Sequence, residues 1–234
     1  MINNSDANIS DNVKRIRENI ANAAIEAGRD PNEIMLVAAS KTKATSEIRQ
    51  AIAAGVDAVG ENRVQEMLVK HSEDAYSGAP LHFIGNLQSN KVNKVVGVCD
   101  LIESVGSQSL LLAIAKRAKA LGIVQNVLLE VNVGREPQKG GIFPENLEEV
   151  LEVASKIDGI NVHGLMAIPP FYDEKERFCY YFDIIFKLFI DISTKKYDNV
   201  SVRLLSMGMS DSYIEAIRCG SNIVRIGTAL FGKR

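Results

Sequence analysis

The chain has 234 residues, with 27 basic and 29 acidic side chains and 46% hydrophobic residues. This length suits one large domain or two small ones with a sizeable buried core. Because the charges nearly balance and no basic cluster is interleaved with aromatic residues, we expect no nucleic-acid-binding surface. No linker or shift in composition divides the sequence, so we expect residues 1–234 to form a single domain.

The cysteines, the histidines and the hydropathy of the chain indicate where the protein is located and whether it binds a metal. The cysteines Cys99, Cys179 and Cys219 are odd in number and far apart, which favours a reducing compartment without a disulfide framework. The histidines are isolated, so we expect no metal site. The N-terminus lacks the apolar core of a signal peptide, and the most apolar helical stretch, Phe182–Ile192, is too short and too charged to span a bilayer. We therefore expect a soluble cytoplasmic protein.

The first predicted element in chain order is a helix. Residues 1–8 are expected to be frayed. Apolar residues then recur at helical spacing over Ile9–Ala27, Gly28 supplies a C-terminal cap, and Pro31 prevents the helix from continuing. The chain therefore begins with a helix that precedes the first strand.

The stretch Ile34–Lys43 is an apolar run that ends in two lysines. Such a run predicts a strand buried on both faces, here residues 34–40. A lysine held at the mouth of a barrel is well placed to form a Schiff base. The structural alternative is an ordinary strand followed by two solvated lysines. A continuing strand would put Lys41 and Lys43 on the same face, so spacing does not choose between them.

The rest of the chain alternates short apolar strands with helices. The further strands are predicted at residues 57–60, 81–85, 101–105, 127–133, 162–168, 201–205 and 223–226. The helices after them and after the first strand are predicted at residues 45–54, 63–71, 88–96, 108–121, 145–157, 173–195 and 211–219. This alternation indicates parallel βαβ units and fits a small (β/α)8 TIM barrel with an extra N-terminal helix. A doubly wound open sheet is the alternative, weakened by the lack of a GxGxxG motif or a P-loop.

Two loops late in the chain have groups suited to a phosphate. The segment 206–210, SMGMS, precedes a helix, and Gly227-Thr228 follows the last strand. Barrel enzymes often hold phosphate in these loops, through free backbone N–H groups and the helix dipole. Glycine permits close approach, and hydroxyls donate further hydrogen bonds. The same groups also fit an ordinary helix start, with a capping box from Ser212 to Glu215.

Arg225 is the only ionisable residue in the apolar stretch Asn222–Gly227. A buried arginine needs a partner. One interpretation is a structural ion pair with a carboxylate such as Glu61 or Asp211. The other is contact with a ligand, and the sequence pattern allows both.

Several motifs together resemble the pyridoxal phosphate homeostasis protein family. They are ASKTK (39–43), GENRVQE (60–66), HFIGNLQSNK (82–91), HGLMAIP (163–169), SMGMSD (206–211) and VRIGTALFG (224–232). They run in the same order along nearly the whole chain. The resemblance implies a single barrel, similar to the N-terminal domain of alanine racemase, that binds pyridoxal 5′-phosphate (PLP) covalently. Ala44 and Ser212, where proline and an acidic residue are common, are minor departures.

The resemblance also implies roles for individual residues. The Schiff-base lysine is Lys41, and Lys43 is a nearby cation that favours the free amine of Lys41. The implied phosphate contacts are Ser206, Met207, Ser210, Gly227 and Thr228. Arg225 faces the pyridine nitrogen, disfavours its protonation and makes the ring a weaker electron sink. Asn62 is a further cofactor-side residue, whereas Lys139 is expected to be a solvated loop lysine.

The family's role is to bind and supply the cofactor and so to maintain vitamin B6 and amino-acid balance. By resemblance we expect a monomer, with PLP-dependent apo-enzymes as recipients. Alanine racemase uses a tyrosine from a second domain as its opposite-face acid/base, and this chain ends six residues after Thr228, so we expect a carrier without efficient racemase activity. One alternative is a racemase-like enzyme with an unknown substrate. Without the resemblance, a barrel with a Schiff-base lysine and a phosphate site also fits a class I aldolase.

Overall fold

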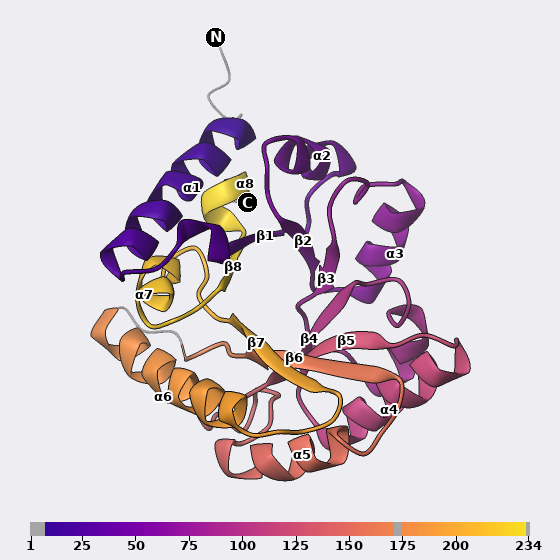
Figure 1. Cartoon of the computed structure of the whole chain (residues 1–234). Helices are drawn as coiled ribbons and strands as arrows, with labels where there is room; N and C mark the ends of the chain where they lie inside the picture. The colour runs from indigo at the N-terminus through magenta and orange to yellow at the C-terminus, as the bar shows by residue number, and fades with distance from the viewer. Residues whose placement is uncertain (1–7, 171–174, 233–234) are drawn as a thin grey trace.

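Eight parallel strands close into a barrel in the computed structural model, which describes residues 8–170 and 175–232 (Figure 1). The strands are β1 (Met35–Ala39), β2 (Ala58–Glu61), β3 (Leu81–Phe83), β4 (Leu101–Val105), β5 (Gln125–Glu130), β6 (Ile160–Met166), β7 (Val200–Ser206) and β8 (Ile223–Ile226). Each strand pairs with the next along the chain, and β8 pairs back with β1. This closed order confirms the predicted (β/α)8 barrel and excludes the doubly wound open sheet.

Helices surround the barrel as an outer layer (Figure 1). The α-helices are α1 (Ile9–Glu26), α2 (Thr45–Ala53), α3 (Val64–Ser72), α4 (Gln108–Ala120), α5 (Leu147–Ala154), α6 (Lys175–Thr194), α7 (Tyr213–Arg218) and α8 (Thr228–Phe231). The 3-10 helices are η1 (Pro31–Glu33), η2 (Ser89–Lys94) and η3 (Pro144–Asn146). Among the helices described, none is both long enough and apolar enough to cross a membrane.

The N-terminal helix α1 lies beside α2, α7 and α8, outside the barrel. Its apolar residues at helical spacing are buried: Ile9, Val13, Ile16 and Ile20. The side chain of Asn8 caps the helix, since its Oδ1 accepts a hydrogen bond from the Ser10 N–H at 3.1 Å. The expectation of a frayed segment at 1–8 is therefore wrong for Asn8, and residues 1–7 lie outside the described residues.

Two strands begin two residues earlier than the apolar pattern predicts. β5 begins at Gln125 rather than 127, and β6 begins at Ile160 rather than 162. The Gln125 side chain is buried, with Nε2 donating to the Cys99 carbonyl at 3.0 Å and Oε1 accepting from the Gly97 N–H at 3.0 Å. Because both polar ends of the amide are satisfied, a glutamine can begin a buried strand. A pattern search for apolar residues overlooks this kind of strand start.

Some helical segments also differ from prediction. Residues 88–96 form only the 3-10 helix η2, with hydrogen bonds such as Lys91 N–H to Gln88 O at 2.9 Å. Residues 145–157 are divided into η3 and α5. The short helix α8 was not predicted, and its residues Leu230 and Phe231 are buried in the cluster that contains α1. Of the predicted helix 173–195, residues 173–174 lie outside the described part.

The barrel interior changes from apolar to polar along its axis. Its apolar cluster consists of Val37, Ala58, Leu101, Leu128, Met166 and Ile223. Toward the carboxyl ends of the strands, the buried side chains become charged or hydroxylated, with Glu103, Ser206 and Arg225 all less than 5% exposed. Side chains at alternate positions of a strand face the same side, so these residues continue the inward-facing rows. The fold therefore places its buried charges at the end of the barrel where sites of this fold are built.

Gly164 provides a test of the strand packing. Its φ is +149°, and the β6–β7 register shifts next to it. A Cβ at this position would lie 1.8 Å from the Leu204 carbonyl oxygen. We expect Gly164→Ala to lower the free energy of unfolding by about 3 kcal/mol or more, because the β6 or β7 backbone must shift. Denaturant unfolding measures this change.

Gly140→Ala is the matched control, since a Cβ there would meet no atom within 4 Å. We expect this variant to change the unfolding free energy by less than about 0.5 kcal/mol. Equal stability of the two variants would contradict the packing at Gly164.

Candidate functional site

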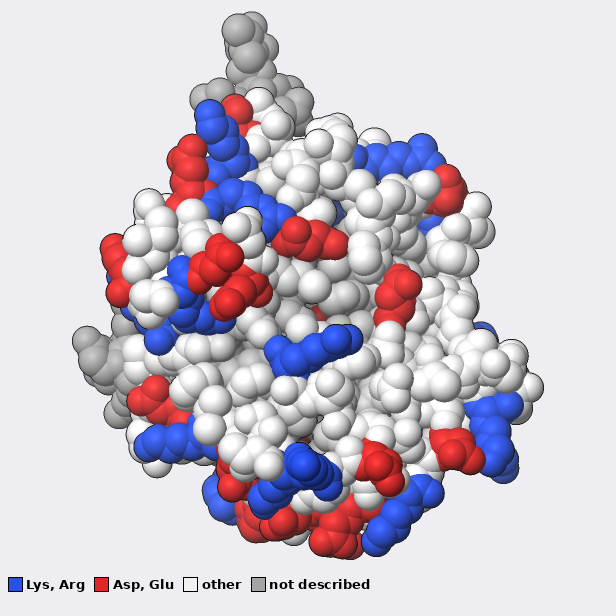
Figure 2. Space-filling model, in the orientation of Figure 1, with Lys and Arg blue, Asp and Glu red and all other residues white. Residues whose placement is uncertain are grey.

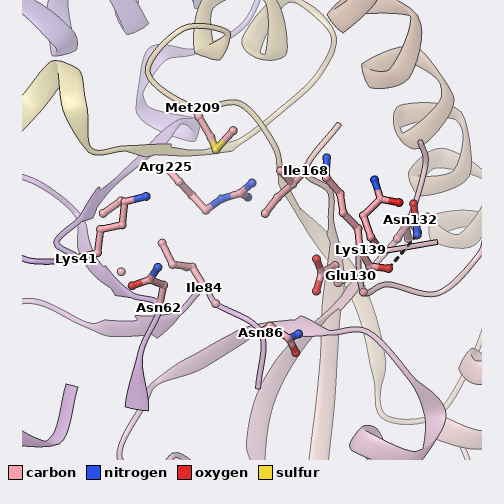
Figure 3. Close-up of a pocket in the computed structure, with 16 residues that line it drawn as sticks. Lys41, Asn62, Ile84, Asn86, Glu130, Asn132, Lys139, Ile168, Met209 and Arg225 are labelled. Atoms are coloured by element: carbon pink, nitrogen blue, oxygen red, sulfur yellow. Dashed lines mark hydrogen bonds between the residues drawn. The ribbon is translucent and has the colours of Figure 1, made fainter. Parts of the chain in front are cut away.

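A cavity of about 420 Å³ opens at the carboxyl ends of the barrel strands (Figure 3). Its lining residues come from most of the strand ends: Ala39, Lys41, Gly60, Asn62, Ile84, Gly85, Asn86, Glu130, Val131, Asn132, Gln138, Lys139, Gly140, Ile168, Met209 and Arg225. Lys41 and Asn62 lie on one side, and Glu130 and Lys139 lie across the cavity from them (Figure 3). The structure thus brings together Lys41, Asn62 and Arg225, which are distant in sequence.

A second cavity of about 140 Å³ adjoins the first. It shares Lys139, Ile168, Met209 and Arg225 with the main cavity and is otherwise lined mostly by the loops after β6 and β7. Around the face of the barrel seen in Figure 2, Lys and Arg side chains are interspersed with Asp and Glu side chains.

The two lysines after β1 diverge. The strand ends at Ala39, and a turn follows in which the Lys43 N–H donates to the Ser40 carbonyl at 3.0 Å. Lys41 is exposed and lines the cavity. The Lys43 Nζ instead lies 3.2 Å from Glu47 Oε1 and 3.2 Å from the Phe231 carbonyl oxygen.

The predicted role of Lys43 is therefore corrected. A shared face requires a continuing strand, and this strand stops two residues before Lys41. Lys43 is not among the residues that line the cavity, and its charge is paired with Glu47. Its ammonium group is thus directed to Glu47 and Phe231, whereas Lys41 lines the cavity.

Arg225 is buried and fixed by three contacts. Its Nη2 donates to the Ala167 carbonyl at 3.0 Å, its Nη1 donates to the Ser206 hydroxyl, and Nη1 lies 3.7 Å from Glu103 Oε2. The ion-pair partner is thus Glu103 and not Glu61 or Asp211. Arg225 also lines both cavities, so the ion pair with Glu103 leaves it in reach of a ligand, and ligand contact stays a prediction.

Glu103 links Arg225 to His82 in one buried network. Its Oε1 lies 2.7 Å from His82 Nδ1, and its Oε2 accepts from the Ser206 hydroxyl at 2.5 Å. Burial alone would raise the pKa of Glu103, but His82, Arg225 and Ser206 together hold the pKa below its usual value. The carboxylate is therefore ionised beneath the cavity.

Glu130 is a second carboxyl group near Arg225, and it lines the cavity itself. Burial raises the pKa of Glu130, while the Arg225 guanidinium acts in the opposite direction. Sequence reasoning missed Glu130, Glu103 and His82. Arg225 drew attention because it is a single ionisable residue in a predicted strand. Glu103 is also a single ionisable residue in a predicted strand, so the same signal could have found it.

The five predicted phosphate residues are not equally available. The Ser206 hydroxyl is engaged by Glu103 and Arg225, and the Met207 N–H donates to the Ile223 carbonyl at 3.1 Å. Ser210 Oγ accepts from the Ala229 N–H at 3.2 Å, which joins the loops after β7 and β8. Gly227 is half-buried and Thr228 is exposed. Among the predicted groups, those of Ser210, Gly227 and Thr228 lie together near the protein surface.

The residues around the main cavity have chemical groups suited to binding PLP. An amine is present at Lys41, and buried Oδ1 of Asn62 has no hydrogen-bond partner among the described residues. Leaving a buried polar atom unpaired is costly, so this atom points to a ligand or solvent partner. Close strand packing forms the wall here, since a Cβ at Gly85 would lie 2.2 Å from the Asn62 carbonyl oxygen.

The described residues include no group of three acidic, His or Cys side chains placed to hold a metal ion.

Comparisons with known proteins agree on one group of relatives. The family model described as the N-terminal domain of alanine racemase matches residues 12–234. A pyridoxal phosphate homeostasis protein of Aquifex aeolicus is 43% identical over 227 residues, which cover 97% of this chain and 99% of that protein. A protein of the same name from Escherichia coli is 36% identical over 229 residues, which cover 97% of each chain.

Solved structures share the fold. PipY of Synechococcus elongatus, determined with PLP bound, is 30% identical with a TM-score of 0.83, and the match covers 96% of this chain and 100% of that one. An unknown protein from Bifidobacterium adolescentis is 37% identical with a TM-score of 0.92, covering 99% and 97% of the two chains. An alanine racemase of Clostridium difficile is 19% identical with a TM-score of 0.71, covering 96% of this chain and 60% of that one. The last likeness concerns the fold alone.

The Glu103 network predicts a pH dependence of stability. Because the pKa of Glu103 is lower in the folded protein than in the unfolded chain, its stabilising contribution is complete above about pH 4.3 and is lost as the pH falls through the folded-state pKa. We expect Glu103→Gln to lower the unfolding free energy by about 3 kcal/mol at pH 7 and to weaken its dependence on pH below 4. Denaturant unfolding from pH 7 to pH 3 measures both effects.

Glu149→Gln, at an exposed position, is the control and should follow the wild-type profile. If Glu103→Gln keeps the full acid sensitivity of the wild type, the ionised network is wrong.

Proposed function

Because this chain belongs to the pyridoxal phosphate homeostasis protein family, we propose that it binds PLP as a Schiff base on Lys41 and supplies it to other proteins. The observation that carries the proposal is the position of Lys41 in a 420 Å³ cavity with Asn62 and Arg225. The Nζ of Lys41 has no hydrogen-bond or ion-pair partner among the described residues. An amine without a partner, at the rim of a cavity of this size, is accessible to a carbonyl compound.

The remaining site residues would bind and orient the cofactor. Asn62 offers its unpaired amide oxygen on the same side of the cavity as Lys41. For the phosphate, the proposed contacts narrow to Ser210, Gly227 and Thr228, since the predicted groups of Ser206 and Met207 are already engaged. Hydroxyls and the free N–H groups that begin a helix are suitable donors for an anion. The cofactor itself would supply the electrophilic carbonyl and an electron-withdrawing ring.

Arg225 would limit how strongly that ring withdraws electrons. Its guanidinium is held by Ala167 and Ser206, so it cannot easily turn away from the cavity. Burial lowers the pKa of Arg225, but Glu103 and Glu130 oppose this effect. A cation beside the pyridine nitrogen disfavours its protonation, which favours holding the cofactor over broad carbanion chemistry. This supports the carrier interpretation.

A racemase-like activity is the second candidate, and one observation favours it. Glu130 lies across the cavity from Lys41 and has a raised pKa, so it is placed to hold a proton on the side away from the lysine (Figure 3). An acid on the opposite side is what a two-base racemisation requires. Its presence makes a direct measurement of turnover necessary.

The wider cellular role belongs to the same proposal. We propose a monomer, built as a single domain over residues 1–234, that acts in the cytoplasm and transfers PLP to PLP-dependent apo-enzymes. Membership of the family supports the transfer role. The free thiols of Cys99, Cys179 and Cys219 support a reducing compartment.

The lysine assignment can be tested by absorbance. After PLP is added and the unbound cofactor is removed, the purified protein should keep a near-visible band that Lys41→Ala abolishes and Lys43→Ala retains. Reduction with borohydride followed by peptide mass mapping should place the adduct on Lys41. A band that survives in Lys41→Ala but disappears in Lys43→Ala would contradict the assignment, and a class I aldolase purified without added PLP would be colourless.

Turnover can be tested by isotope exchange at Cα of alanine with the PLP-loaded protein. We expect exchange slower than about 1 per second, which is the low end of typical enzyme turnover. Faster exchange that is lost in Glu130→Gln would overturn the carrier proposal in favour of the racemase-like alternative. Asn86→Asp, a change elsewhere in the cavity lining, controls for a general effect of altered cavity charge.

A further inference from the structure

Three charged residues lie directly behind the turn that carries Lys41. Lys70 on α3 is 6% exposed, and its Nζ donates to Glu61 Oε1 at 2.7 Å, to Glu66 Oε1 at 2.7 Å and to the Ser40 carbonyl at 2.8 Å. These three bonds use every proton of the ammonium group. We call Glu61, Glu66 and Lys70 the Lys70 clamp.

The clamp holds the peptide groups on both sides of Lys41. The Ser40 carbonyl, which accepts from Lys70, belongs to the peptide group before Lys41. The Thr42 N–H, which donates to Glu66 Oε1, belongs to the peptide group after it. The Ser40 hydroxyl donates to Glu61 Oε1 at 2.5 Å. Each member of the clamp therefore contacts a neighbour of Lys41, and none of them lines the cavity.

The backbone of this turn needs such support. Thr42 has a φ of +64°, in the left-handed region that a β-branched residue rarely adopts. A non-glycine residue in this conformation is strained and persists only where the surroundings determine it. The contact of Glu66 with the Thr42 N–H stabilises the conformation that separates Lys41 from Lys43.

A contribution to stability alone does not account for the clamp. Glu61 is fully buried, and its Oε2 has no hydrogen-bond partner among the described residues. Buried ion pairs often stabilise a fold less than apolar residues of similar size. Burial raises the pKa of Glu66, but Lys70 and the Thr42 N–H more than offset this and keep its pKa below the usual value. The buried side of this turn thus contains a carboxylate, Glu66, that is kept ionised by Lys70 and by the Thr42 N–H.

We propose that the Lys70 clamp is a positioning device that directs the Lys41 amine into the cavity and keeps Lys43 out of it. This inference rests on the proposed function, since it explains how one of two neighbouring lysines is selected. Lys70, Glu61 and Glu66 act through the backbone of residues 40–42 and are not themselves ligands of the cofactor.

The test compares Lys70→Met with Lys119→Met. Methionine keeps an unbranched side chain, one heavy atom shorter than lysine, and removes the three donors of Lys70, while Lys119 is an exposed lysine paired with Asp158. The readouts are the rate of PLP capture by absorbance, the share of borohydride-trapped label on Lys41 by peptide mapping, and amide hydrogen exchange of residues 40–43 without PLP. We expect Lys70→Met to slow capture about tenfold or more, to spread label to Lys43, and to speed exchange about tenfold. Lys119→Met should behave as wild type.

Two further variants separate positioning from folding. Lys70→Arg keeps the charge and should restore most of the selectivity for Lys41. If Lys70→Met does not fold, Glu66→Gln replaces it, because it keeps the size of a side chain that is 21% exposed and removes only the charge. Unfolding in denaturant, measured for each variant, shows whether slower capture follows global stability.

The outcomes distinguish the clamp from the proposed function. Label on Lys41 in the wild type, with the same rate, selectivity and exchange in Lys70→Met, would overturn the clamp and leave the function intact. If the wild-type protein carries no PLP label on Lys41, the proposed function is overturned. Amide hydrogen exchange of residues 40–43 would then decide whether the clamp orders the turn. Unchanged exchange in Lys70→Met would reject the clamp in that case too.

Discussion

Pairing of β8 with β1 closes the barrel, and every part of the candidate site depends on that closure. In this pairing Val37 lies opposite Arg225, so a residue near the end of the chain becomes a neighbour of the first strand. The lysine that follows β1 and the arginine in β8 then line one cavity. An open sheet with the same strands would leave these two at opposite edges, and the site would not exist.

Two buried ionic clusters support the cavity from different directions. The Glu103 network lies beneath it and fixes Arg225, while the Lys70 clamp lies behind the Lys41 turn. Each cluster ends on a backbone carbonyl at the rim, that of Ala167 in one case and that of Ser40 in the other. Charges taken out of water need partners, and both clusters pair acidic with basic side chains. The rim of the barrel is therefore held in place mostly by buried side chains, with Glu66 as a partly exposed member.

Much of the fold and part of the site could be predicted from the sequence, for identifiable reasons. Apolar runs separated by helical periodicity locate the strands, and Arg225 stands out as a lone charge in such a run. The partners of that charge could not be found, because pairing with Glu103 depends on the register across a closed barrel. Likewise, Lys41 lines the cavity and Lys43 does not, and the residue between them, Thr42, has a left-handed conformation that no spacing rule anticipates. The start of β5 was missed because Gln125 satisfies its amide internally.

Lys43 connects the beginning of the barrel to the last helix. Its ammonium group lies 5.6 Å from the ring centroid of Phe231 as well as near the carbonyl of that residue, so the first strand-to-helix connection is attached to the last helix. Helix α8 also packs on α1, so α8 contacts both the β1–α2 connection and the N-terminal helix. The junction between β1 and β8 is therefore stabilised by side-chain contacts outside the sheet. Without them, backbone pairing alone would have to keep the first and last strands together.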